Sequence, residues 1–231
     1  MKNAPRAGIS TLMFDLDGTL LDSFSVHYES YVVMFGRFGI SITQETFLAG
    51  YSPNWYHTYE AMGLAKEHWD LANTIWLEEA EKLTAELFPG TVKTLEALSA
   101  NYFLGLVTSG SKSRVNRDLM RTGIDRFFQT IVTGNDITDP KPSPEALLLA
   151  LKNVDKAPNE AIYIGDAYAD FQMAKAAGVH FIGVSSQFAN LRSDDPDYAV
   201  HSITDLPGIL SEFRLEKQGR QDLRSPGTDQ V

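Results

Sequence analysis

Two aspartates, Asp15 and Asp17, are separated by one leucine and stand at the end of a short apolar run. The run covers residues 9–14 and holds two β-branched residues, which is typical of a buried strand. In an open α/β sheet, ligands bind at the carboxyl ends of the strands. Two carboxylates at such an edge could act as nucleophile, proton donor or ligand. The alternative is an ordinary strand end, followed by a turn at Gly18.

The stretch around these aspartates belongs to a longer pattern. Residues 15–23, Asp-Leu-Asp-Gly-Thr-Leu-Leu-Asp-Ser, resemble the first motif of the haloacid dehalogenase-like hydrolases, in the branch with phosphoglycolate phosphatase and β-phosphoglucomutase. Three later stretches are similar to the remaining motifs and come in the expected order, at Thr108, at residues 139–145 and at residues 165–170. The resemblance covers about residues 9–210. Ordered motifs are a specific signal, whereas any one of them alone would be weak.

The resemblance implies a phosphoryl transfer in which Asp15 is the nucleophile. An aspartate can attack a phosphoryl group and form an aspartyl-phosphate, which divides one difficult transfer into two steps. Asp17 would protonate the leaving oxygen and then deprotonate the attacking water. Dehalogenases of this family lack the second aspartate, because a halide leaving group needs no proton. Asp17 therefore favours an oxygen leaving group, and so a phosphatase or a phosphomutase.

The resemblance also implies a Mg²⁺ site. Residues 165–170, Gly-Asp-Ala-Tyr-Ala-Asp, are similar to the acidic fourth motif and follow an apolar run. Hard oxygen ligands at a strand end suit Mg²⁺, which keeps several waters and shares the substrate phosphate. We expect Asp15, Asp166 and the backbone carbonyl of Asp17 as direct ligands. Asp170 would be a ligand or the partner of one, and the alternative is an acid that favours the start of a helix.

Other polar residues are expected to hold the phosphate. Several acids around one point repel each other and need a cation. Lys141, in a loop stiffened by prolines, is the expected cation beside Mg²⁺. Thr108 matches the motif that donates a hydroxyl to the phosphate. Ser109 and Gly110 could add backbone N–H groups in an anion-binding turn, although serine here is also typical of a helix cap.

The remaining cations and histidines give weaker signals. Lys112 and Arg114 could attract an anionic substrate, but we interpret them as surface charges. The five histidines show no metal-ligand spacing. We interpret them as structural or solvated, with His27 and His57 as secondary candidates for a substrate site.

Apolar periodicity indicates the elements that position these groups. Between residues 23 and 88, apolar and aromatic residues recur at three- and four-residue spacings, which predicts a helical bundle with no strand. From residue 89 onward, strands and helices alternate, which predicts right-handed crossovers and a parallel sheet. The expected fold class is therefore α/β, a Rossmann-like doubly wound parallel sheet with an inserted α-helical cap. We assign residues 1–22 and 89–215 to the catalytic core, 23–88 to the cap and 216–231 to a polar tail.

One loop of the cap is expected to recognise the leaving group. In proteins that this chain resembles, a cap loop reaches over the site, and residues 50–55, Gly-Tyr-Ser-Pro-Asn-Trp, stand at the matching position. Tyr51, Ser52 and Trp55 offer stacking and hydrogen-bonding surface. We predict Tyr51 and Ser52 as substrate-binding residues. The alternative for Trp55 is packing in the cap core.

Composition limits the partners. A formal net charge of −10 argues against binding to nucleic acids or anionic membranes, which attract basic patches. The absence of cysteine excludes disulfides and thiolate catalysis. Without a recognisable signal peptide or membrane-spanning run, we expect a cytoplasmic protein that acts on a small phosphorylated metabolite. Its oligomeric state, monomer or dimer, is left open.

Two other functions are compatible with these motifs. A β-phosphoglucomutase-like isomerase would use the same aspartates, but in that branch Val or Ile is frequent where this chain has Thr19. A non-catalytic binding protein on the same fold would not need an acid pair beside a metal site. The expected function is therefore a Mg²⁺-dependent phosphatase. Its substrate is left open among sugar phosphates, phosphoglycolate, nucleotides and pyrophosphate.

Overall fold

The computed structural model describes residues 8–52, 54–186, 191 and 195–211. Its centre is a six-stranded sheet with the order β5-β4-β1-β6-β7-β8, in which all neighbours are parallel. The strands are β1 (Thr11–Phe14), β4 (Phe103–Val107), β5 (Thr130–Val132), β6 (Ala161–Gly165), β7 (His180–Val184) and β8 (Tyr198–Val200). The predicted doubly wound parallel α/β fold is confirmed.

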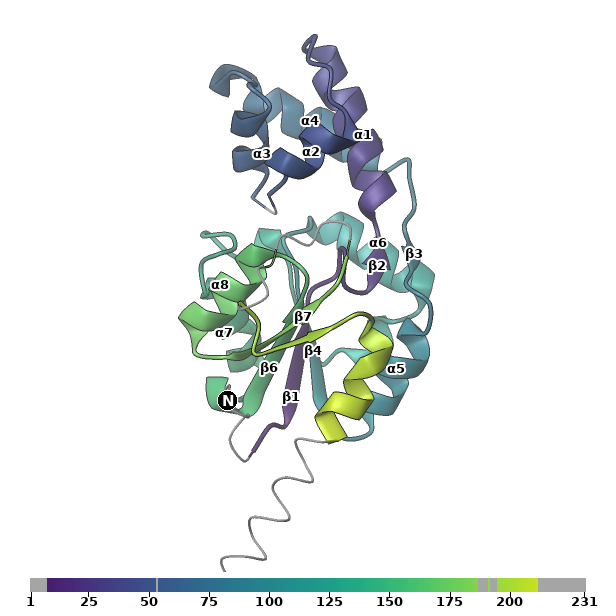
Figure 1. The fold of residues 1–231 in the computed structure, drawn as a ribbon, viewed down its shortest axis with the longest axis vertical. Coiled ribbons are helices and arrows are strands. Elements are labelled where there is room, and N and C mark those ends of the chain that lie inside the picture. The colour runs from purple at the N-terminus through teal and green to yellow at the C-terminus, as the bar shows by residue number, and fades with distance from the viewer. Residues whose placement is uncertain (1–7, 53, 187–190, 192–194, 212–231) are drawn as a thin grey trace, which may run out of the picture.

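Helices cover both faces of the sheet (Figure 1). They are α5 (Thr91–Ser99), α6 (Lys112–Thr122), α7 (Glu145–Asn153) and α8 (Tyr168–Ala177). Helices α5 and α6 pack on one face and α7 and α8 on the other. Consecutive β1 residues serve opposite layers, since Leu12 and Phe14 join the first core and Met13 the second. All of β1 is therefore buried, as expected for a strand covered on both faces.

Four further helices lie beyond one end of the sheet (Figure 1). They are α1 (Phe24–Arg37), α2 (Gln44–Gly50), α3 (Trp55–Ala61) and α4 (Trp69–Ala80). Their aromatic residues, including Tyr31, Phe47 and Tyr59, pack into a core of their own. Short 3₁₀ helices are found at Lys66–His68, Asp125–Phe127, Gly134–Asp136, Pro158–Glu160 and Ile203–Asp205. No helix in the described part of the chain is long and apolar enough to cross a membrane.

The prediction that residues 23–88 hold no strand is wrong. Strand β3 (Glu86–Leu87) pairs antiparallel with β2 (Leu21–Asp22). This ribbon is too short for a periodicity to reveal it, and it joins the two places where the chain passes between the sheet and the helical bundle. The exact boundaries of core and cap remain our proposal. Pro53 and the predicted tail lie outside the described residues.

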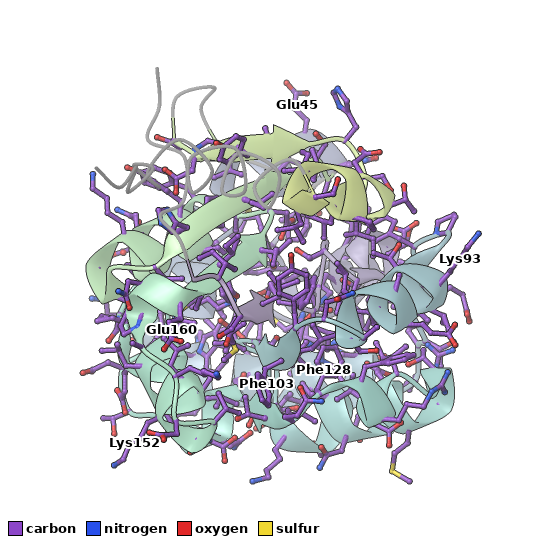
Figure 2. All side chains as sticks on the ribbon, turned by 90° about the horizontal axis from the view of Figure 1, so that it is seen from below. Glu45, Lys93, Phe103, Phe128, Lys152 and Glu160 are labelled. Carbon is purple, nitrogen blue, oxygen red and sulfur yellow. The ribbon has the colours of Figure 1, made fainter. Side chains whose placement is uncertain are left out.

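The register of the sheet gathers the motifs at one edge. Phe14 pairs with Leu106 and with Ile164, so the residues after these strands come side by side. Figure 2 views the molecule from the opposite end, where Phe103 and Phe128 lie among charged residues such as Lys152. The motif residues therefore meet at the carboxyl edge, on the side of the sheet that faces helices α1–α4.

Candidate active site

The turn after β1 places both aspartates at the carboxyl edge. Leu16 between them is buried in the core, so the side chains of Asp15 and Asp17 leave the chain on the other side. Gly18 then adopts a positive φ of 77°. A β-carbon on Gly18 would overlap the Asp166 carboxylate, so only glycine fits this close approach.

Three buried carboxyl groups crowd together at this edge. Asp15, Asp166 and Asp170 each offer one oxygen, and these atoms lie within 4.8 Å of one another. Burial raises the pKa of Asp166 well above its usual value, and the neighbouring Asp15 and Asp170 raise it further. Burial likewise raises the pKa of Asp15 to about 7, although Lys141 opposes this. The cluster therefore needs positive charge, and a donor set of carboxylate oxygens fits Mg²⁺.

Lys141 supplies part of that charge from inside the cluster. Its side chain is buried, and Nζ donates to Asp15 Oδ1 at 2.7 Å, to Asp170 Oδ1 at 2.7 Å and to the Tyr163 hydroxyl at 2.8 Å. Burial alone would lower the pKa of Lys141, but Asp15 and Asp170 raise it above its ordinary value. The Tyr163 hydroxyl in turn donates to the Val107 carbonyl at 2.9 Å. The lysine is therefore held against Asp15 and Asp170.

We expect the substitution Lys141→Met to destabilise the protein by about 3–5 kcal/mol, because it leaves buried carboxylates without their partner. Urea unfolding in the presence of a chelator measures this loss. Lys112→Met is the matched control, since Lys112 is exposed and pairs with Asp136 at 3.0 Å. Equal unfolding midpoints for the two variants would contradict the role of Lys141 in neutralising the cluster.

Both oxygens of Asp170 have partners within the protein. Oδ1 accepts from Lys141, and Oδ2 accepts the backbone N–H of Ala167 at 3.1 Å, in the first turn of α8. Asp170 is therefore also an acid that favours the start of α8, which was the alternative to its role at the metal site. This geometry suits a residue that orients Lys141 better than it suits a direct metal ligand. Both oxygens of Asp166 also have partners, Thr19 Oγ1 at 3.3 Å and Ser186 Oγ, but these are neutral hydroxyl groups and not a cation.

The expectation that Arg114 is a surface charge is wrong. Its side chain is 5 % exposed and holds Asp17 with two hydrogen bonds, from Nη1 to Oδ1 at 3.0 Å and from Nη2 to Oδ2. Buried residues of α6 recur at helical spacing, namely Arg114, Val115, Asp118 and Leu119. Arg114 therefore lies on the inner face, a position that its spacing from Val115 and Asp118 could have indicated. Lys112 is exposed, as predicted.

His27, a secondary candidate, is buried beside the same carboxylate. Its Nε2 lies 3.3 Å from Asp17 Oδ1. Burial would raise the pKa of Asp17, but Arg114 and His27 hold it well below its usual range. The carboxylate of Asp17 thus faces these two side chains. The backbone carbonyl of Asp17 is the group that stays available to the expected metal site. His57 is exposed.

The turn after β4 brings hydroxyl groups to this edge, but the Gly110 N–H, which was expected to bind an anion, is engaged within the turn. Thr108 is buried, and its Oγ1 accepts the Gly110 N–H at 3.2 Å. The Ser109 hydroxyl is buried and has no hydrogen-bond partner among the described residues. Ser111 begins α6 without a side-chain cap, so the helix-cap alternative is not observed. Thr108 and Ser109 therefore offer hydroxyl groups at the edge where Asp15 lies.

A cavity of about 170 Å³ lies between this edge and the four outer helices. Predicted residues in its wall are Asp15, Asp17, Tyr51, Ser52, Thr108, Ser109, Gly110, Lys141 and Asp166. Asp170 is not in the wall and lies behind Lys141. Trp55 both lines the cavity and packs against the aromatic core of the outer helices. The wall also contains Asn73, Trp76 and Leu77 of α4, and none of these residues was predicted to bind substrate.

Comparisons with known proteins agree with this geometry. Residues 12–184 match the family model described as haloacid dehalogenase-like hydrolase. Pyrophosphatase PpaX of Bacillus velezensis is 33% identical over 86% of this chain and 94% of its own length. PpaX of Oceanobacillus iheyensis is 30% identical over 88% and 98%. A haloacid dehalogenase-like hydrolase from Streptococcus pneumoniae superposes with a TM-score of 0.77 at 26% identity, over 87% of this chain and 98% of that one.

Proposed function

The chain belongs to the haloacid dehalogenase-like hydrolases and is a phosphatase of that family, and from this premise we propose that it is Mg²⁺-dependent and forms an aspartyl-phosphate. The observation that carries the proposal is the contact of Lys141 Nζ with Asp15 Oδ1 at 2.7 Å, inside a cluster of buried carboxyl groups. This contact holds the carboxylate of Asp15 at the open edge of the sheet, where a phosphoryl group can approach it.

The described residues suit the first step of such a reaction. An Asp15 oxygen attacks phosphorus, and the transferred phosphoryl oxygens accept hydrogen bonds from Thr108 and Ser109. Lys141, whose N–H groups donate to Asp15, Asp170 and Tyr163, contributes its positive charge beside the phosphoryl group. Mg²⁺, held by Asp15, Asp166 and the Asp17 carbonyl, would neutralise phosphate charge and orient the group for in-line attack. The products of this step are the aspartyl-phosphate at Asp15 and the leaving group.

Asp17 supports the proton transfers. As an ionised carboxylate, it can accept the proton of the water that attacks the aspartyl-phosphate. Protonation of a leaving oxygen requires a proton on Asp17, but Arg114 binds both of its oxygens and, with His27, lowers the pKa of Asp17 well below its usual range. The guanidinium must therefore give up Asp17, so that this carboxyl group can take up a proton and pass it to the leaving oxygen.

The size of the cavity and the relatives narrow the substrates to test. A cavity of about 170 Å³ favours a small phosphorylated compound. The relatives at 33% and 30% identity are named pyrophosphatases, so pyrophosphate is a second candidate substrate beside the phosphomonoesters. A β-phosphoglucomutase-like activity stays the alternative, and it would isomerise a sugar phosphate without net release of phosphate.

The test of this function is phosphate release from a panel of phosphomonoesters and pyrophosphate, with and without Mg²⁺. We expect Mg²⁺-dependent release from at least one small compound. A sugar phosphate that is isomerised without phosphate release would support the mutase instead. No turnover of any compound in the panel would contradict the proposed function.

The loop of Tyr51 and Ser52 is expected to set part of the substrate preference. Burial raises the pKa of Tyr51 well above its usual value, so its hydroxyl stays a hydrogen-bond donor. Ser52 Oγ accepts the Asn54 N–H at 3.2 Å, which shapes the loop. We predict that Tyr51→Ala and Ser52→Ala lower kcat/KM about 10-fold for the best natural substrate, and much less for a small acyl phosphate.

The matched control for this prediction is His57→Ala, an exposed position on α3 outside the cavity wall. It should leave both values of kcat/KM unchanged. Equal losses on the two substrates in the Tyr51 and Ser52 variants would mean that the loop serves folding or closure rather than recognition.

A further inference from the structure

We propose that Arg114 and the indole N–H of Trp76 form a second anion-binding subsite, which takes a phosphate or carboxylate on the leaving group of the substrate. The proposal rests on the function proposed above and narrows its substrate class to phosphorylated compounds whose leaving group is itself negatively charged. Asp17 occupies the position of that anion in the present structure.

The guanidinium of Arg114 is fixed in the cavity wall. Asp17 binds it from one side, and Asp118 Oδ2 lies 3.5 Å from Nη1 on the other. Arg117, the neighbour of Asp118, contacts the second Asp118 oxygen at 3.3 Å and so keeps that carboxylate in place. A β-carbon on Gly110 would overlap the guanidinium, so glycine at this turn makes room for it. Arg114 is therefore held against the turn that offers Thr108 to the phosphate.

Several hydrogen-bond donors in the same wall lack partners. The indole Nε1 atoms of Trp55 and Trp76 and the Nε of Arg114 are buried without a hydrogen-bond partner among the described residues. Buried donors of this kind are normally satisfied, and leaving one unpaired is unfavourable. All three groups can only donate. A ligand that satisfies them must supply acceptor oxygens, as a phosphate or a carboxylate does.

Ring contacts place Trp76 on the side of Asp17. The ring of His27 lies edge-on to Trp76 with centroids 5.5 Å apart, and His27 Nε2 is 3.3 Å from Asp17 Oδ1. Arg114, Asp17, His27 and Trp76 thus form a continuous wall. Since Asp17 is the proposed proton donor to the leaving group, this wall is where the leaving group lies.

An exchange of partners at Arg114 favours an anionic leaving group. The wall holds the carboxyl groups of Asp15, Asp17 and Asp166 and the cations Lys141 and Arg114, each of which is bound by aspartates. When a second anion replaces Asp17 on Arg114, the guanidinium exchanges one anionic partner for another. The buried guanidinium therefore keeps an anionic partner throughout. Asp17 keeps His27 and gains the freedom to reach the leaving oxygen. A neutral leaving group offers no such exchange.

Matched substrates test this subsite. Phosphoglycolate and ethyl phosphate have leaving groups of similar length and differ in the carboxylate, and pyrophosphate adds the phosphate case. We expect the unmodified protein to prefer both charged compounds over ethyl phosphate. In Arg114→Met, kcat/KM for the charged compounds should fall about 100-fold, because charge-assisted hydrogen bonds are lost. The value for ethyl phosphate should fall much less, so the ratio of the two values of kcat/KM measures the subsite.

Milder variants separate binding from folding. Trp76→Phe keeps the aromatic ring and removes one donor, and should lower kcat/KM about fivefold for the charged compounds alone. Arg114→Lys should restore part of the preference. Lys112→Met is the control from the same helix, since Lys112 is exposed, pairs with Asp136 and does not line the cavity. It should leave the preference unchanged.

Binding provides a readout that is independent of turnover. Calorimetry in the presence of Mg²⁺ should show that methylenediphosphonate binds more tightly than methylphosphonate, and that Arg114→Met removes the difference. Equal losses of charged and neutral substrates in Arg114→Met, or no preference in the unmodified protein, would overturn the subsite. Absence of turnover with this binding difference intact would count against the proposed function alone.

Discussion

Replacement of Asp15 by asparagine is expected to lower kcat by about 10⁴-fold or more, because the amide is a far poorer nucleophile than the carboxylate. The side chain keeps its shape, and its amide oxygen can still accept the hydrogen bond from Lys141. One negative charge also leaves the crowded set of Asp15, Asp166 and Asp170, so the fold should be retained. Steady-state kinetics and a thermal unfolding curve on the same preparation measure both effects.

Asp139→Asn is the matched control for this variant. Asp139 is exposed and lies two residues from Lys141, so the same chemical change beside the site should leave kcat unaltered. A phosphate-mimicking fluoride complex should bind against Asp15 in the unmodified protein. Near-normal turnover in a purified, folded Asp15→Asn protein would show that the carboxylate is not the nucleophile.

The residues that could be placed from the sequence are those whose position depends on the strands. Asp15, Thr108 and Asp166 each follow a short apolar strand directly. Parallel pairing of these strands brings such positions to one edge of the sheet, independently of how the helices pack. Lys141 could be placed because its proline-rich loop resembles a known motif. For these positions the local signal and the final structure agree, so the sheet and the place of the proposed phosphoryl site could be predicted together.

The leaving-group side of the cavity could not be predicted in this way. The place of Arg114 depends on which face of α6 turns inward, and that is decided by packing of Val115 and Leu119 in the core. Trp76 has the spacing of a core residue and partly serves as one, yet it also lines a cavity formed with another part of the chain, and its buried indole nitrogen has no hydrogen-bond partner among the described residues. Helical periodicity indicates that a side chain is buried, but it does not indicate which residues or ligands that side chain contacts.

Removal of divalent metal should abolish phosphate release, and Mg²⁺ should restore it. The carboxyl oxygens of Asp15, Asp166 and Asp170 lie within 4.8 Å of one another, and Lys141 alone does not balance them. Ca²⁺ should bind the same oxygens and inhibit, because its larger and looser coordination misplaces the nucleophile. Activity after exhaustive dialysis against a chelator, with each ion added back, measures this dependence.

Thermal stability gives a second measure of the same site. An ion that binds only the folded protein adds about 2.7 kcal/mol of stability at a concentration 100 times its Kd, so both Mg²⁺ and Ca²⁺ should raise Tm. Asp166→Asn should remove most of this rise, since Asp166 is the expected ligand that Lys141 does not contact, whereas the exposed Asp139→Asn control should keep it. Inhibition by Ca²⁺ without a rise in Tm would place the ion on the substrate rather than on the carboxylates. Full activity after chelation would mean that phosphate release needs no divalent ion and that Asp166 is not a metal ligand.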